Sequence, residues 1–124
     1  MGAEQRLVFI VEDDAAVRAS TRVLLEASGY VVRDFSSAEQ LLDAGDLSQA
    51  GCIVLDYNLP GMSGIELLES LRAQGDRTPA IIVSSNGKQI VQRAARAGVA
   101  AVLRKPITAD ALTQWLDQIF TAAR

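Results

Sequence analysis

Residues 52–64 read CIVLDYNLPGMSG, and this stretch decides the fold class. Its first four residues are apolar without alternation, which is typical of a strand covered by helices on both faces of a parallel sheet. Asp56 follows directly, and from residue 63 onward apolar side chains recur at helical spacing. The stretch therefore predicts a buried strand that ends in a carboxylate and leads through a short loop into a helix.

The same alternation of strand and helix extends over the whole chain. The apolar runs that predict strands cover residues 7–11, 30–33, 52–55, 80–84 and 99–103. The segments that predict helices cover residues 15–28, 36–44, 63–74, 88–97 and 108–120. Strands that alternate with helices predict right-handed crossovers and a doubly wound α/β fold with a parallel sheet. No repeat or linker interrupts the pattern, so we expect residues 1–124 to form a single domain.

Several helix ends and helix faces carry signals of their own. Ser36 stands three residues before Glu39, which predicts a capping box at the second helix. Thr108 is expected to cap the last helix. Trp115 and Phe120 fall on the apolar stripe of that helix, and this spacing predicts that both are core residues.

Composition excludes several classes of function. The 124 residues include no histidine and one cysteine, which removes Ser-His-Asp and Cys-His catalysis and a zinc site built from Cys and His. The net charge of −3 argues against a domain that binds DNA phosphates by itself. No apolar run approaches the roughly 18 residues that a membrane span needs, and no signal peptide is visible, so we expect a cytoplasmic location without membrane contact.

Polar groups follow four of the five expected strands. In a doubly wound sheet, ligands bind outside the carboxyl ends of the strands. The groups found there are Glu12, Asp13 and Asp14 after the first strand, Asp56 after the third, Ser84 after the fourth and Lys105 after the fifth. We expect the first, third, fourth and fifth strands to lie side by side, which would bring these groups together.

The chemistry of this set is consistent. Crowded carboxylates favour Mg²⁺, which prefers oxygen ligands, and a carboxylate can attack phosphorus. An ammonium and a hydroxyl can then contact phosphoryl oxygens. Taken singly, each group has a simpler interpretation: an acidic pair can cap a helix, Ser84 can be an ordinary strand-end hydroxyl, and Lys105 a surface lysine. Their occurrence together at four strand ends favours a site.

The chain resembles the receiver domain of two-component response regulators over essentially its whole length. The motifs that carry the resemblance are VEDD at 11–14, LDYNLPGMSG at 55–64, VSS at 83–85 and KP at 105–106. The second motif is highly specific. The resemblance implies a CheY-like, flavodoxin-like (βα)5 sandwich with a five-stranded parallel sheet in the order 2-1-3-4-5.

The resemblance also implies a role for each site residue. Asp56 is similar to the phosphoacceptor, and Ser84 and Lys105 to the residues that contact the phosphoryl group. The implied Mg²⁺ ligands are Glu12, largely through water, Asp13, Asp56 and the backbone carbonyl of Asn58.

Three other positions carry expectations once the family is considered. Asp14 falls outside the acidic pair and is expected to cap the first helix, and the Lys105–Pro106 peptide is expected to be cis. Val102 departs from the family, because many receivers carry at this position an aromatic ring that moves on activation. Val102 is either a plain edge-strand residue or the sign of a switch that uses the fourth helix instead.

The implied partners are a histidine kinase or histidine phosphotransfer protein as phosphoryl donor, and a downstream protein or fused output domain. The output would bind the face of helix 4, strand 5 and helix 5, which can also form a phosphorylation-linked dimer. Such a domain promotes its own phosphoryl transfer and autodephosphorylation and is not an enzyme with a separate substrate. Residues 77–105 hold six bases and no acid, which indicates either a solvated helix face or a docking surface for an acidic partner.

Two other functions remain open from the sequence. A phosphatase of the haloacid dehalogenase type also uses an aspartate nucleophile, but it needs a second acid two residues later, where this chain has Asn58. A pseudo-receiver would be an interaction module that is never phosphorylated, and the complete set of site residues argues against it.

Overall fold

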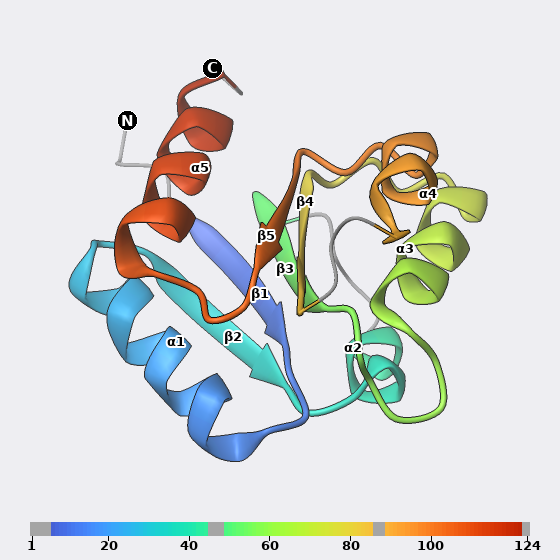
Figure 1. Cartoon of the computed structure of the whole chain (residues 1–124). Helices are drawn as coiled ribbons and strands as arrows, with labels where there is room; N and C mark the ends of the chain where they lie inside the picture. Colours follow the sequence, from blue (N-terminus) through green and yellow to red (C-terminus); the bar gives the residue numbers. More distant parts are fainter. Residues whose placement is uncertain (1–5, 45–48, 86–88, 123–124) are drawn as a thin grey trace.

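The computed structural model describes residues 6–44, 49–85 and 89–122, which form a parallel sheet with helices on both faces (Figure 1). The strands are β1 (Leu7–Val11), β2 (Val31–Phe35), β3 (Cys52–Asp56), β4 (Ala80–Ser84) and β5 (Ala101–Arg104). The helices are α1 (Ala15–Ala27), α2 (Ala38–Asp43), α3 (Gly64–Ala73), α4 (Val91–Arg96) and α5 (Ala109–Ala122). The strand order β2-β1-β3-β4-β5 confirms the expected doubly wound fold.

Two hydrophobic layers hold the helices on the sheet. Helices α1 and α5 cover one face of the sheet, and α2, α3 and α4 cover the other (Figure 1). The residues of β3 and β4 are buried throughout, as their continuous apolar sequences predicted. Leu55 packs toward the larger cluster and Val54 toward the smaller one, so alternate residues of one strand serve both cores.

Most of the predicted helix ends are found. Asp14 caps α1, because its Oδ1 accepts hydrogen bonds from the backbone N–H groups of Ala16 and Val17 at 2.9 and 3.1 Å. Thr108 caps α5 through a hydrogen bond of 3.2 Å from the Ala111 N–H to its Oγ1.

The capping box predicted for Ser36 and Glu39 is wrong by one residue. Ser37 is the N-cap of α2, and its Oγ accepts the Gln40 N–H at 3.1 Å. The Ser36 N–H in turn donates to Gln40 Oε1 at 2.8 Å. The sequence offers two adjacent serines, and the second is the N-cap; because Gln40 accepts from Ser36 rather than from the N-cap residue, the box is not a complete one.

The prediction that Trp115 is a core residue is also wrong. Leu112 and Leu116 are fully buried and occupy the centre of the α5 stripe, whereas Trp115 lies on the flank of the helix and is 37% exposed. Phe120 is half-buried, with its ring centroid 5.4 Å from that of Tyr30. The apolar stripe of α5 is thus buried at its centre and only partly covered at Trp115.

Two further sequence expectations meet the structure in part. Helix α4 is shorter than the predicted 88–97, and Lys88 lies outside the described residues. Val102 is half-buried on edge strand β5 and packs against the larger core. None of the helices in the described ranges combines the length and the apolar character that crossing a membrane requires.

Candidate functional site

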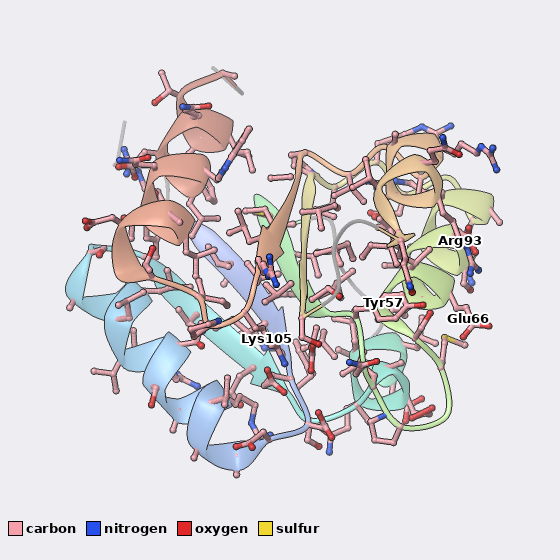
Figure 2. The ribbon with its side chains drawn as sticks, viewed as in Figure 1. Tyr57, Glu66, Arg93 and Lys105 are labelled. Atoms are coloured by element: carbon pink, nitrogen blue, oxygen red, sulfur yellow. The ribbon has the colours of Figure 1, made fainter. Side chains whose placement is uncertain are left out.

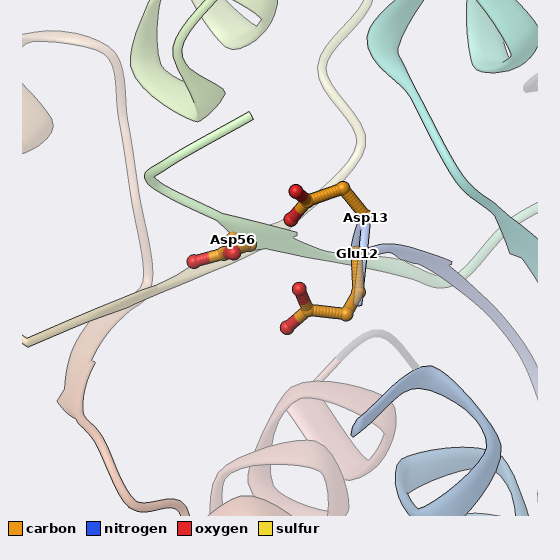
Figure 3. A group of neighbouring side chains, drawn as sticks. All are labelled: Glu12, Asp13 and Asp56. Atoms are coloured by element: carbon orange, nitrogen blue, oxygen red, sulfur yellow. The ribbon is translucent and has the colours of Figure 1, made fainter. Parts of the chain in front are cut away.

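Three carboxylates meet at the carboxyl edge of the sheet. Glu12 and Asp13 follow β1 directly, and Asp56 is the last residue of β3 (Figure 3). Because β1 and β3 are paired in parallel up to Val11 and Leu55, the residues after them emerge side by side. One carboxylate oxygen from each acid lies within 4.8 Å of the others. The structure therefore brings together the acids that the sequence singled out.

The three acids differ in their surroundings. Glu12 and Asp56 are only 6% and 4% exposed, whereas Asp13 is exposed. Lys105 Nζ lies 3.0 Å from Asp56 Oδ1 and 3.7 Å from Glu12 Oε1. Two backbone N–H groups donate hydrogen bonds to the same carboxylates, Asp14 to Glu12 Oε2 at 3.1 Å and Asn58 to Asp56 Oδ1 at 3.4 Å. The two buried carboxylates thus share one ammonium.

This crowding changes the proton affinities in the site. Burial raises the pKa of Glu12 to about 7, with further contributions from the charge and hydrogen bond of Asp56, against the Asp14 N–H and Lys105. Burial alone would lower the pKa of Lys105, but the hydrogen bond and charge of Asp56, with the charges of Glu12 and Asp13, raise it. Three acids facing one ammonium leave excess negative charge, and carboxylate oxygens are the donors that a hard divalent cation prefers. The residues present therefore fit such an ion.

Ser84 and Lys105 lie beside each other at the same edge. Ser84 is the last residue of β4 and is 2% exposed. The Lys105 N–H donates to the Ser84 carbonyl at 3.0 Å, which extends the pairing of β4 and β5 by one residue. The Lys105–Pro106 peptide is cis, as predicted. Figure 2 shows Lys105 near the end of β5, at the centre of this edge.

The loop after β3 explains much of the motif at 55–64. The Tyr57 N–H donates to the Val83 carbonyl at 2.8 Å, and the Gly64 N–H donates to the Tyr57 carbonyl at 2.9 Å. A Cβ atom on Gly64 would lie 2.4 Å from the Asp56 carbonyl oxygen, so only glycine lets α3 begin against this strand. Ser63 and Glu66 form a complete capping box at the same point. Asn58 lies exposed in this loop.

One residue near the site gave no sequence signal. Arg18 of α1 donates from Nη1 to the Glu12 carbonyl oxygen at 2.8 Å. An arginine on an amphipathic helix is usually a surface residue, so its spacing alone does not indicate a role.

The basic segment at 77–105 is partly neutralised within the chain. Arg93 of α4 makes two hydrogen bonds to Glu69 of α3, from Nε to Oε2 at 3.0 Å and from Nη2 to Oε1 at 2.8 Å. This pairing lowers the pKa of Glu69. Figure 2 places Arg93 on the same side of the molecule as Tyr57 and Glu66. With Lys105 in the acidic cluster, carboxylates of this chain pair with two of the five bases of this segment that the structure describes.

Comparison with known proteins shows the family of the chain. The model of the response regulator receiver domain matches residues 8–117. The transcriptional regulatory protein FixJ of Azorhizobium caulinodans is 42% identical over 100 residues, which are 80% of this chain and 47% of that protein. FixJ of Bradyrhizobium diazoefficiens is 34% identical over 94% of this chain and 57% of its own length.

A solved structure gives the same result for the fold. The response regulator StyR superposes with a TM-score of 0.88 at 38% identity, over 97% of this chain and 61% of its own. This chain spans about half the length of the curated relatives it matches. The match at 8–117 and the identity to these relatives show that the chain belongs to the family of response regulator receiver domains.

Proposed function

We propose that Asp56 accepts a phosphoryl group in a two-component phosphorelay. Accepting a phosphoryl group is the general function of the receiver family. The observation that carries the assignment to Asp56 is its buried carboxylate, 3.0 Å from Lys105 Nζ within the acidic cluster.

In the proposed reaction, a carboxylate oxygen of Asp56 attacks phosphorus and forms the acyl phosphate. The bond from phosphorus to the donor's imidazole nitrogen, or to the leaving oxygen of a small acyl phosphate, breaks and leaves its electron pair on that atom. The Lys105 ammonium and the Ser84 hydroxyl then contact the phosphoryl oxygens and stabilise their charge.

A divalent cation, Mg²⁺, belongs to this proposal. Asp13, Asp56 and the carbonyl of Asn58 would hold it, with Glu12 acting largely through water. The excess of carboxylates over ammonium groups in the cluster supports this ligand set. When bound, Mg²⁺ supplies positive charge that offsets the charges of the carboxylates and of the phosphoryl oxygens.

The domain acts on itself in this proposal. It promotes its own phosphorylation and the later hydrolysis of its own acyl phosphate, and turns over no separate substrate. The phosphatase alternative lacks its second acid, because Asn58 stands two residues after Asp56.

The donor is proposed to be a histidine kinase or a histidine phosphotransfer protein, because this chain contains no histidine. A groove of about 540 Å³ supports its approach beside Lys105, between α1 and the segment after β5. Val17, Pro106 and Ile107 give the groove an apolar lining. A donor protein seated there would lie next to the edge where Asp56 stands.

The output is proposed to act through the face of α4, β5 and α5. The curated relatives are named transcriptional regulatory proteins and extend well beyond this chain, which supports a fused output domain or a downstream protein partner. The exposed Trp115 and Arg104 lie on elements of this face and give it both apolar and basic character. Because Val102 has no ring to move, the switch would rely on α4, and a phosphorylation-linked dimer would use the same face.

The remaining proposals concern the domain as a whole. Residues 1–124 would act as one receiver domain in the cytoplasm. The net charge of −3 favours protein partners over direct contact of this domain with nucleic acid.

Incubation of the chain with acetyl phosphate tests the acceptor. We expect one phosphoryl group per chain in Mg²⁺, none in EDTA, and none in Asp56→Asn in either condition. Asp43→Asn, which changes an exposed acid of α2, is the matched control and should be phosphorylated like the unsubstituted chain. Phosphorylation of Asp56→Asn at the control rate would exclude the assignment, and an unsubstituted chain that is never phosphorylated would favour the pseudo-receiver.

A further inference from the structure

The backbone of Glu12 is held on both sides although the residue lies beyond the end of β1. Its N–H donates to the Phe35 carbonyl of β2 at 3.0 Å. Its carbonyl accepts from Arg18 Nη1 at 2.8 Å. These two bonds orient the peptide planes before and after Glu12, and the second plane leads directly into Asp13. The exposed Asp13 side chain has little packing of its own, so its position follows from this backbone.

Arg18 is itself held by a carboxylate on the neighbouring strand. Its Nε lies 3.5 Å from Asp34 Oδ1, and Arg22 Nη1 lies 2.7 Å from Asp34 Oδ2. Asp34 of β2 thus bridges two arginines one turn apart on α1. Of these two arginines, Arg18 also contacts the backbone of Glu12, whereas Arg22 Nε lies 3.1 Å from Glu26 Oε2.

We propose that Arg18, oriented by Asp34, is a positioning residue that sets the Glu12–Asp13 peptide so that the acids converge on a divalent cation. This inference rests on the proposed function of the acidic cluster. In this proposal α1 and β2 help to form the site, although neither element supplies a ligand to the cation. Partners that orient metal ligands typically change metal affinity by about tenfold or more when removed.

The positive charge of Arg18 allows a positioning effect on Mg²⁺ binding to be distinguished from a purely electrostatic effect. A guanidinium near a cation site repels the cation, so its loss should by charge alone strengthen Mg²⁺ binding. If Arg18 acts by positioning, its loss should weaken Mg²⁺ binding instead. The two effects have opposite signs.

The test is a Mg²⁺ titration of the full chain, followed by NMR through the backbone amides of Asp13 and Asp56. We expect the dissociation constant for Mg²⁺ to rise about tenfold in Arg18→Gln. Arg18→Lys, which keeps the charge but cannot reach both Asp34 and the Glu12 carbonyl from one planar group, should lie between it and the unsubstituted chain. Arg22→Gln loses its contact with Asp34 without touching the Glu12 carbonyl, and should change the constant less than about twofold.

Thermal unfolding in EDTA provides a readout that does not depend on the cation. Arg18→Gln and Arg22→Gln should lower the melting temperature similarly, because each breaks one pair with Asp34 and one further contact, with the Glu12 carbonyl or with Glu26. An unchanged or lower dissociation constant in Arg18→Gln would overturn the inference, as would an equal rise in Arg22→Gln. No saturable Mg²⁺ shift in the unsubstituted chain would instead overturn the cation site itself, and this inference with it.

Discussion

Lys105 balances two buried acids, Asp56 and Glu12, and the site depends on it before any phosphoryl group arrives. Its ammonium lies 3.0 and 3.7 Å from their carboxylate oxygens. Removal of one partner from a buried charge pair costs more than an exposed pair contributes, because the remaining charge has lost its compensation. Lys105 is one-third exposed at its side chain, which moderates this cost.

We therefore predict that Lys105→Ala lowers the free energy of unfolding by about 2 kcal/mol in EDTA at pH 8. Urea denaturation measures it. Arg104→Ala removes the preceding, exposed cation and should change the unfolding free energy by less than about 0.5 kcal/mol. Equal losses in the two variants would show that Lys105 does not compensate the buried acids.

At the scale of single residues, the sequence predicted the acidic cluster well and its support poorly. Asp56, Glu12 and Lys105 could be placed because strand ends in a parallel sheet meet at one edge. Arg18 could not be placed, because its contact joins a helix to a loop through a backbone carbonyl, and that contact leaves no pattern in the sequence. The prediction for Trp115 was wrong because helical spacing gives the direction of a side chain from the helix axis, but not how far neighbouring elements cover that side chain.

At the scale of elements, a hydrogen bond joins α3 to the residue that directly follows the carboxyl end of α4. Arg72 of α3 donates from Nε to the Ala97 carbonyl at 2.9 Å, directly after α4. The same guanidinium donates to the Asp76 carbonyl at 3.2 Å. At the other end, the N-cap residue Ile90 offers no side-chain hydrogen bond. Helix α4 is therefore tied to α3 directly after its last residue by Arg72 and within the helix by the pairing of Arg93 with Glu69.

We predict that Arg72→Met lowers the free energy of unfolding by about 1–2 kcal/mol and speeds amide hydrogen exchange around Ala97. The methionine keeps the apolar stem but leaves the Ala97 carbonyl without this donor. Hydrogen exchange followed by NMR measures the local effect. Arg77→Met, at a nearby exposed arginine, is the control, and an exchange pattern that matches this control would contradict the role given to Arg72.

The element boundaries show where sequence information was sufficient. The bounds of β1 and β4 agree with the predicted runs, because both strands lie inside the sheet and all of their residues except Leu7 are buried. Helices α2 and α4 were less predictable. Each has six residues, so one turn more or less depends on local caps that several adjacent residues can supply.

At the scale of the whole molecule, a tyrosine joins the start of β2 to α5. The Tyr30 hydroxyl donates to the Asp117 carboxylate, and Arg6 Nη1 lies 3.7 Å from the same carboxylate. Burial, with the hydrogen bond and charge of Asp117, raises the pKa of Tyr30 to about 12, against the opposing charge of Arg6. The neutral phenol is thus favoured in the folded chain.

This contact predicts a loss of stability in alkali. Because the folded pKa is above the ordinary value of 10.0, the stabilisation is present below pH 10 and is lost as pH rises to about 12. The unfolding free energy of the unsubstituted chain minus that of Tyr30→Phe should fall by about 2 kcal/mol over this range. Urea denaturation at each pH measures it, with Tyr57→Phe as control. A difference that stays constant with pH would show that Tyr30 titrates normally.

The whole fold was more predictable than its surface. Five apolar runs and the right-handedness of crossovers restrict the chain to a few possible sheet topologies. The family resemblance implied the strand order that the structure has. The surface depends on pairings between distant elements, such as Arg93 with Glu69, which removed part of a basic face that the sequence alone suggested.

Asp56, and no other acid of the cluster, is proposed to carry the phosphoryl group. Borohydride reduces an acyl phosphate of aspartate to homoserine, so the acceptor can be read from a peptide map after phosphorylation with acetyl phosphate and Mg²⁺. We predict homoserine at position 56 and unchanged aspartate at position 13. Homoserine at position 13, or an unmodified position 56 in a phosphorylated chain, would contradict it.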